Sequence, residues 1–205
     1  MIKDIKRFIS GMVETNSYIF IDENNNCVIV DPDGSESQFI NFVKENELNL
    51  LCILLTHGHI DHIGAVEGIK KEFDMDVLAG ELEQQVLKDP YLNASLMFGA
   101  KTSLEADRYL KDGEIVNAGS MSFKVMLTPG HTCGSVCYLI EDIIVSGDTL
   151  FEGSCGRADL PTGDWNTIVE SLMKLKALKG DYRVLPGHGP ATTLDKERRT
   201  NMFMR

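Results

Sequence analysis

All five histidines of this chain lie in three short segments that contain glycine, and this clustering limits the folds the sequence can adopt. Three of them fall in the heptapeptide THGHIDH, from Thr56 to His62. The other two, His131 and His188, each follow a Pro-Gly pair. Because imidazole is the commonest metal ligand in proteins, we expect a fold that brings the three segments together around metal.

Each histidine segment follows a predicted β-strand, and so does one aspartate, Asp148. The strands are expected at 50–55 before His57, 122–127 before His131, 143–146 before Asp148 and 183–185 before His188. The run from Leu50 to Leu55 is continuously apolar, which is typical of a strand buried on both faces. These side chains are therefore expected to meet at one edge of a β-structure.

The spacing of the ligands suggests two metal positions. In an extended loop, His57 and His59 point to one side and can hold one ion, whereas Asp61 and His62 follow a turn and can face a second ion. His131 and His188 come from separate loops and could complete each half. Asp148 could bridge, because a carboxylate has two oxygens.

The chemistry of these ligands narrows the metal. Imidazole and carboxylate without thiolate suit zinc, iron or manganese, and we rank zinc first. A single structural zinc fits poorly, because seven nitrogen and oxygen ligands exceed the four of a closed structural site. A lone histidine is usually a packing residue, but chance packing does not explain why all five gather in three loops.

The remaining pattern predicts two batches of strands, each followed by helices. Further strands are expected at 17–22, 27–31, 77–79 and 135–140, and helices from Ser35 or Ser37 to Asn46, at 62–73, 81–88 and 164–179, and from Leu194 onward, with helical pieces in 91–112. This order favours an α+β fold in which two sheets pack together with helices outside. The length fits one domain spanning residues 1–205.

Charge and cysteine content exclude some partners. The chain has 20 Lys and Arg against 31 Asp and Glu, a net charge of −11, which argues against nucleic-acid or anionic membrane partners. No apolar run approaches the roughly 20 residues of a membrane span, and the N-terminus lacks the apolar stretch of a signal peptide. Five cysteines, an odd number, then suggest free thiols in a reducing cytoplasm.

The motif H-x-H-x-D-H, followed by separated His, Asp and His, resembles the metallo-β-lactamase superfamily, and within it the short bacterial branch of glyoxalase II-like hydrolases. The resemblance runs from about Thr15 to the end. The stretches that carry it are THGHIDH at 56–62, PGHT at 129–132 with Gly134-Ser135, GDTLF at 147–151, GSCGR at 153–157 and PGHGP at 186–190, then Glu197-Arg198 and Asn201.

This resemblance implies a four-layer αββα sandwich and a site for two divalent metal ions. The first ion would take His57, His59 and His131, and the second Asp61, His62 and His188, with Asp148 bridging. Asp61 and Asp148 are the expected catalytic carboxylates, and Asp61 would also orient the metal-bridging hydroxide that attacks the substrate. β-Lactam hydrolysis is disfavoured, because two-zinc lactamases commonly carry Cys where Asp148 stands.

The expected activity is hydrolysis of a small-molecule thioester, such as an S-2-hydroxyacyl-thiol. The motifs contain no additional acid to protonate a leaving group, and a thiolate leaves without prior protonation whereas an amide nitrogen needs a proton. Esters and lactones rank next. Arg157 either binds a substrate carboxylate or forms an ion pair with Asp159 or Asp164.

Glutathione specificity does not carry over with the metal chemistry. In glyoxalase II a Lys and a Tyr help bind glutathione, and the matching positions here resemble Arg157 and Asp159. The helical extension with basic glutathione contacts is also expected to be missing, since the sequence stops at Arg205.

Three other functions stay open. A persulfide dioxygenase of this superfamily, with one Fe(II), could use His57, His131 and Asp148. A nuclease is a poorer fit because of the charge of −11. A metal-binding module without enzymatic activity is the third, and the complete seven-ligand set argues against it.

Overall fold

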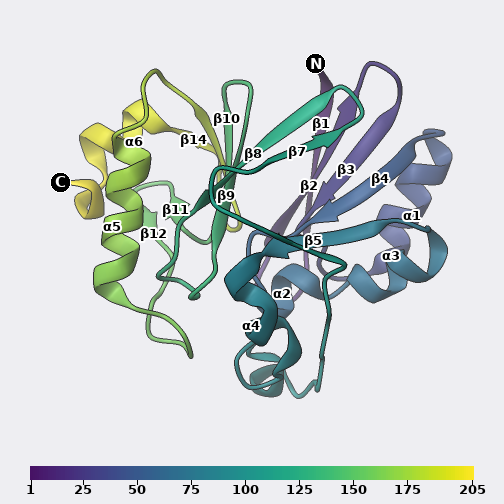
Figure 1. Cartoon of the computed structure of the whole chain (residues 1–205), viewed down its shortest axis with the longest axis horizontal. Coiled ribbons are helices and arrows are strands. Elements are labelled where there is room, and N and C mark those ends of the chain that lie inside the picture. The colour runs from purple at the N-terminus through teal and green to yellow at the C-terminus, as the bar shows by residue number, and fades with distance from the viewer.

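The computed structural model describes residues 1–205 and contains two six-stranded β-sheets (Figure 1). The first sheet has the order β1-β2-β3-β4-β5-β6. Its strands are β1 (Ile2–Ser10), β2 (Thr15–Asp22), β3 (Asn26–Val30), β4 (Asn49–Leu54), β5 (Asp76–Gly80) and β6 (Arg108–Leu110). The first three strands pair antiparallel and the last four pair parallel.

The second sheet has the order β14-β13-β10-β9-β8-β7. Its strands are β7 (Ile115–Ala118), β8 (Met121–Leu127), β9 (Val136–Ile140), β10 (Ile143–Gly147), β13 (Arg183–Pro186) and β14 (Thr192–Thr193). Only β10 and β13 pair in parallel. A small separate hairpin joins β11 (Leu150–Phe151) to β12 (Ser154–Cys155).

Strand residues alternate between two apolar layers, which explains the continuous apolar runs in the sequence. All eight residues of β2 are buried. Tyr18 and Phe20 pack between the sheets, whereas Ile19 and Ile21 pack against the helices outside. Successive side chains of a strand point to opposite faces, so a strand covered on both sides needs apolar residues at every position.

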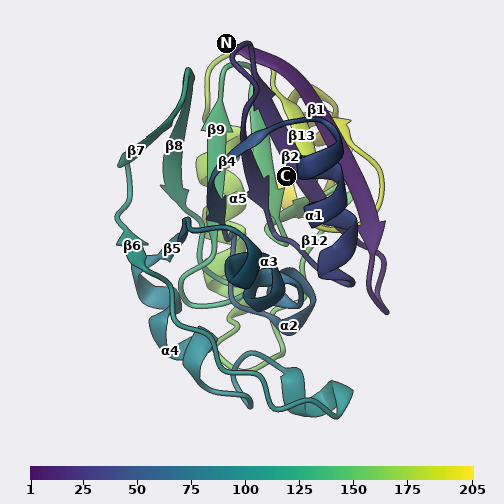
Figure 2. The same cartoon turned by 90° about the vertical axis from the view of Figure 1, so that its right-hand side faces the viewer.

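Helices cover the outer face of each sheet (Figures 1 and 2). The first sheet carries α1 (Glu36–Glu45) and α3 (Val66–Glu72), and the second carries α5 (Trp165–Lys176), α6 (Leu194–Thr200) and the 3₁₀ turn η3 (Met202–Met204). Three apolar cores therefore separate four layers. The predicted α+β fold, a four-layer αββα sandwich, is confirmed.

Short helices gather at one end of the two sheets, where both views place α2 and α4. These elements are α2 (Ile60–Ile63), η1 (Glu81–Glu83), α4 (Gln84–Lys88) and η2 (Ser95–Phe98). None of the helices combines the length and apolar character needed to cross a membrane.

Two expectations for this end were wrong. The helix expected at 62–73 is split into α2 and α3, because the chain bends at Gly64 and the Ala65 N–H donates to the Pro32 carbonyl (3.0 Å). A Cβ at Gly64 would lie 2.5 Å from Asp33 Oδ1, so a larger residue there would displace the Asp33 carboxylate. Residues 91–112 contain one 3₁₀ turn, η2, and strand β6 instead of several helical pieces.

A capping aspartate sets the start of the helix α5. Asp164 caps its N-terminus, accepting a hydrogen bond from the Thr167 N–H (2.7 Å). Ile168, Leu172 and Leu175 bury one face against the second sheet. The helix ends at Lys176, three residues before the expected Lys179.

Candidate metal centre

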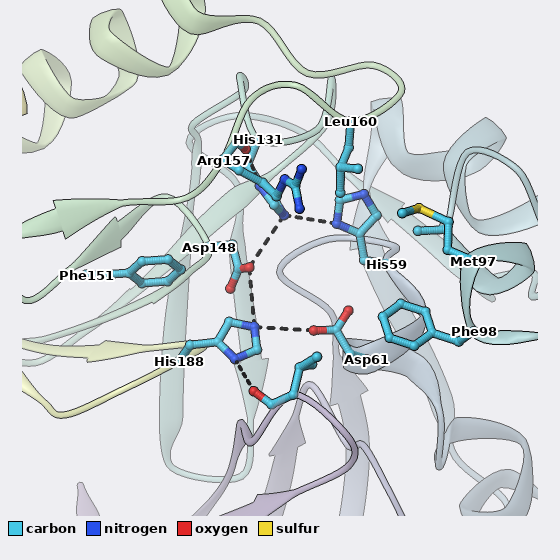
Figure 3. A pocket seen from close by; sticks show the side chains of 12 residues that line it. His59, Asp61, Met97, Phe98, His131, Asp148, Phe151, Arg157, Leu160 and His188 are labelled. Atoms are coloured by element: carbon cyan, nitrogen blue, oxygen red, sulfur yellow. Dashed lines mark hydrogen bonds and ion pairs between the residues drawn. The ribbon is translucent and has the colours of Figure 1, made fainter.

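The predicted metal ligands converge from both sheets at one edge of the sandwich. Figure 3 shows His59, Asp61, His131, Asp148 and His188 of this set. His57 and His59 follow β4, Asp61 and His62 lie on α2, His131 lies between β8 and β9, Asp148 follows β10 and His188 follows β13. The sheets are joined here by backbone bonds from Asn16 N to the Gly187 carbonyl (2.7 Å) and from Val136 N to the Thr56 carbonyl (2.9 Å). This edge is therefore a fixed frame for the ligands.

Three overlapping groups of ligand atoms could each hold a cation. They are His57, His59 and His131; His57, His62 and Asp148; and Asp61, His62 and His188, with the atoms of each group within 4.8 Å of one another. The middle group shares His57 with the first group and His62 with the third. The seven residues that the sequence singled out thus form one continuous cluster.

Atom separations in the cluster match those of ligands that share an ion. They are 2.9 Å for His59 Nδ1–His131 Nε2, 3.5 Å for His62 Nε2–Asp61 Oδ2, 3.2 Å for His188 Nε2–Asp61 Oδ2, 3.4 Å for His62 Nε2–Asp148 Oδ1, and 3.5 Å from Asp148 Oδ2 to both His131 Nε2 and His188 Nε2. Ligands about 2.1 Å from a tetrahedral ion lie about 3.4 Å apart. The spacing therefore fits metal coordination.

Unpartnered buried atoms provide an independent test of this fit. The chain has five buried side-chain nitrogen or oxygen atoms without a hydrogen-bond partner, and four belong to His57, His59, His62 and Asp148. A buried polar atom without a partner is costly, so such atoms are normally satisfied. Divalent cations in the cluster would satisfy His57 Nε2, His62 Nε2 and Asp148 Oδ1, so the donor set fits them. His59 Nε2 would not be satisfied in this way, because His59 presents Nδ1 to the cluster.

Oxygen acceptors behind the histidines orient four of the five rings. The Nδ1–H groups of these rings face Thr56 Oγ1 (3.1 Å) for His57, Asp31 Oδ2 (2.9 Å) for His62, the Arg157 carbonyl (2.6 Å) for His131 and the Val13 carbonyl (3.1 Å) for His188. An Nδ1–H that donates in this way leaves Nε2 free to bind metal. His59 is the exception, since its Nδ1 faces the cluster.

Asp31 is a supporting residue that the sequence analysis placed only at the end of the strand expected at 27–31. Its Oδ2 also accepts from Thr56 Oγ1 (2.6 Å), and its Oδ1 accepts from the Thr56 N–H (2.7 Å). Asp31 directly follows β3 at the end of a buried run, as Asp148 follows β10. That shared position was the available signal.

Glu83 is a second supporting residue, and no sequence pattern pointed to it. Its buried carboxyl accepts hydrogen bonds from the Gly58 N–H (2.7 Å), the Gly134 N–H (2.9 Å) and the Thr132 hydroxyl. It therefore joins the loop that holds His57 to the loop that holds His131. Burial raises the pKa of Glu83 to about 7.

The carboxylates beside His62 favour a positive charge in that part of the cluster. Burial opposes a charge on His62, but the carboxylates of Asp148 and Asp61 outweigh it and raise the pKa of His62 well above its ordinary value. Burial lowers the pKa of His57 well below its ordinary value, so its ring is a neutral ligand. Either protons or metal cations can supply the missing charge.

A close approach of the backbone also shapes the site. A Cβ at Gly187 would lie 2.2 Å from Asp148 Oδ1 and 2.7 Å from His62. A side chain there would displace the carboxylate, so glycine next to His188 is a requirement of the cluster.

A cavity of about 420 Å³ opens onto the cluster. His59, Asp61, His131, Asp148 and His188 line its floor, and Arg157 lies at its edge. The Arg157 guanidinium holds Asp159 through two bonds, of 2.7 and 2.8 Å. Its partner is thus one of the two aspartates expected as alternatives, and its contact with a substrate stays a prediction.

Known proteins resemble this chain over nearly its whole length. A family model described as the Metallo-beta-lactamase superfamily matches residues 11–188. The probable metallo-hydrolase YqgX of Bacillus subtilis (strain 168) is 38% identical, covering 97% of this chain and 96% of YqgX. The hydroxyacylglutathione hydrolase GloC of Haemophilus influenzae (strain ATCC 51907 / DSM 11121 / KW20 / Rd) is 32% identical, covering 93% of both chains.

Solved structures agree with this relationship. The BLEG-1 B3 metallo-beta-lactamase superposes with a TM-score of 0.93 at 37% identity, covering 98% of this chain and 99% of its own. TTHA1623 in a di-iron-bound form superposes with a TM-score of 0.87 at 34% identity, covering 97% and 99%. The chain therefore belongs to the metallo-beta-lactamase superfamily, as a metal-dependent hydrolase with a His/Asp metal-binding cluster.

Proposed function

We propose that this protein hydrolyses thioesters of small molecules at a centre of two metal ions. His57, His59 and His131 hold the first ion, and Asp61, His62 and His188 hold the second. The observation that carries this proposal is the position of Asp148, whose oxygens lie 3.4 to 3.5 Å from His131 on one side and from His62 and His188 on the other. A carboxylate between both sets is suited to bridge two ions.

When bound, two divalent ions would supply an activated hydroxide at neutral pH and would polarise the carbonyl of the substrate. Zinc is our proposal for the metal, with iron or manganese as alternatives. The same ligand types accept all three, and the di-iron form of TTHA1623 supports keeping iron.

In this proposal Asp61 orients the attacking water. Its carboxylate lines the cavity, and its Oδ2 accepts a hydrogen bond from the Thr15 hydroxyl (3.2 Å). Thr15 begins β2 and is buried, so this bond fixes Asp61 from the first sheet. An anchored carboxylate facing the substrate can accept the proton of the nucleophile.

The cavity favours a thioester over an amide as substrate, because apart from the proposed metal ligands it contains no side chain suited to protonate a leaving nitrogen. No Lys, Tyr or Cys lines it. A free thiol has a pKa of about 8.5, so a thiolate leaves without protonation, whereas an amide nitrogen requires a proton. The name of the relative GloC, a hydroxyacylglutathione hydrolase, supports the same class. Esters and lactones are the next substrates to test.

β-Lactam hydrolysis is a second candidate, favoured by one observation. BLEG-1, named a B3 metallo-beta-lactamase, is 37% identical over almost the whole chain. This similarity counts against the expectation that Asp148 disfavours lactams. Hydrolysis of a chromogenic cephalosporin tests this candidate alongside the thioesters. Oxygen uptake with a glutathione persulfide tests the dioxygenase alternative.

The decisive experiment compares Asp148→Asn with Asp142→Asn. Asp148→Asn keeps the shape of the side chain and removes the charge between the two ligand sets, so we expect thioester hydrolysis to fall at least about 100-fold. Asp142 is exposed in the turn between β9 and β10, and its variant serves as the control with unchanged activity. Retention of the wild-type rate by Asp148→Asn would contradict the proposed centre.

The proposed partner is thus a small molecule, with no role for nucleic acid or membrane. The five free cysteines support a reducing compartment, and we propose the cytoplasm.

A further inference from the structure

Large apolar side chains are exposed at the mouth of the metal centre. Val13 comes from the turn between β1 and β2, and Met97 and Phe98 come from η2. Met97 is 68% exposed and Phe98 40%, although both line the cavity. Figure 3 shows them beside His59 and Asp61. We call Val13, Met97 and Phe98 the apolar lip.

The lip is held firmly against the metal-binding helix. Asn93, which is fully buried, donates from Nδ2 to the Thr102 carbonyl (2.9 Å) and accepts from the Ser95 N–H (3.0 Å). The backbone carbonyl of Asn93 accepts a hydrogen bond from the Ile60 N–H (2.9 Å), at the start of α2. The segment that presents Met97 and Phe98 is therefore anchored one residue from Asp61.

Apolar surface continues on both sides of the lip. Across the cavity lie Leu160 and Phe151, whose ring stands edge-on to His188 with centroids 6.0 Å apart. A second cavity of about 220 Å³ shares Val13 and Phe98 with the first and is lined by Met12 and Ile60, but also by Asp33 and Asp61. A ligand at the metals would thus meet apolar side chains mainly within the first cavity.

The same cavity offers little to a substrate with several negative charges. Arg157 is the only Lys or Arg that lines it, and Asp159 already neutralises its guanidinium. Asp61 and Asp148 also line it, but bound cations would balance their charge, so these two carboxylates do not select against an anionic substrate. An uncharged group needs no counter-charge from the cavity wall and gains from burial against the lip.

We propose that the thioester carries an extended, uncharged alkyl group that packs against the apolar lip. The inference rests on the proposed function and names the class of its substrate. The alkyl group can belong to the acyl part or to the thiol part, since both flank the scissile carbonyl. Charged substrates such as S-lactoylglutathione, which carries two carboxylates and one ammonium group, are then poorer than neutral alkyl thioesters.

Two substrate series distinguish the acyl part from the thiol part. One series lengthens the acyl chain of N-acetylcysteamine thioesters from acetyl to octanoyl, and the other lengthens the alkanethiol of acetyl thioesters. Each methylene that is buried raises kcat/KM about two- to fourfold. We expect this stepwise rise with chain length in one of the two series. A flat response in both series would overturn the inference while leaving thioesterase activity established. Failure to hydrolyse any thioester would instead overturn the proposed function, and this inference with it.

Variants of the lip locate the effect. Met97→Ser and Phe98→Ser should each reduce the octanoyl-to-acetyl ratio of kcat/KM, or the corresponding thiol ratio, about three- to tenfold. Met202→Ser is the matched control, because Met202 is also 68% exposed but lies in η3, outside the cavity. Equal ratios in the lip variants and the control would contradict a role for the lip.

Binding of an uncharged probe gives a readout that does not depend on turnover. N-phenyl-1-naphthylamine fluoresces in apolar surroundings, and we expect its dissociation constant to rise at least threefold in Met97→Ser but not in Met202→Ser. Unchanged binding in Met97→Ser would show that the lip does not hold apolar groups.

Discussion

Oδ2 of Asp31 lies 2.9 Å from Nδ1 of His62, and both side chains are buried behind the metal centre. The bond turns Nε2 of His62 toward Asp61 and Asp148. It links the end of β3 to α2, so the first sheet determines which nitrogen of His62 faces the ligands.

Asp31→Asn should therefore weaken metal binding at the second position about 10- to 100-fold. Asp31 has a φ of +50°, and Asn tolerates this conformation well, so the backbone is preserved. Metal titration by calorimetry measures the change. Asp22→Asn is the control: Asp22 is also buried and accepts four hydrogen bonds, but at the far end of β2. Equal losses of affinity in both variants would assign the effect to general destabilisation.

Glu83→Gln should lower both stability and metal affinity. The Glu83 carboxyl accepts hydrogen bonds from backbone N–H groups and a hydroxyl. Glutamine would place an NH₂ group opposite one of these donors, which lowers the free energy of unfolding by about 1–3 kcal/mol. Glu197→Gln is the matched control, because Glu197 is equally buried and accepts from Gly153, Thr192 and Asn201, away from the ligand loops. We expect similar destabilisation in both variants but reduced metal affinity only in Glu83→Gln.

Glu83 also predicts how stability depends on pH. Its pKa is about 7 in the folded protein, against 4.5 ordinarily, so the folded state retains a proton that the unfolded state releases. Its contribution is fully present below pH 4.5 and is lost as the pH rises to about 7, a change of about 3 kcal/mol. Urea unfolding of metal-free protein at pH 5 and pH 8 should show wild type losing more stability than Glu83→Gln. Parallel losses would refute the raised pKa.

Removal of metal should lower the melting temperature, because ions that bind only the folded state stabilise it. At a hundredfold excess over the dissociation constant, one ion adds about 2.7 kcal/mol, or roughly 5–10 °C for a chain of this size. Differential scanning fluorimetry after chelation and after return of zinc measures the shift. Asp148→Asn should recover only part of it, and a full recovery would show that Asp148 holds no ion.

Arg157→Ala should raise KM for thioesters that carry a carboxylate without changing stability by more than about 0.5 kcal/mol, since the exposed Arg157–Asp159 pair contributes little. Asp159→Asn frees the guanidinium and should lower the same KM. Neutral thioesters act as the internal control. If Arg157 is only an ion-pair partner, neither variant will distinguish charged from neutral substrates.

The clustering of the seven candidate ligands was predictable from the sequence, whereas the residues that support them were not. The candidates stand out because a metal demands particular side chains in tight spacing, as from His57 to His62. Glu83 looks like any acidic residue near a surface helix, and only the tertiary fold buries it against Gly58 and Gly134.

Some strands were likewise predictable from the sequence and others were not. The largely buried β4 was recognisable from its apolar run, but β1 was missed, because Lys3, Lys6 and Arg7 interrupt its apolar residues. Its pairing with β2, from Ile2 with Asp22 to Ser10 with Thr15, rests on backbone bonds that any sequence can form. The fold at 91–112 depends likewise on the contacts of the Asn93 side chain.

The most direct test of the account is the metal content of protein purified without chelator, measured by mass spectrometry, with hydrolysis of S-lactoylglutathione and alkyl thioesters assayed on the same sample. The two ligand sets on either side of Asp148 predict about two divalent ions per chain and thioester turnover that is lost on chelation and restored by metal. One iron per chain, with oxygen uptake in place of hydrolysis, would contradict the two-metal hydrolase.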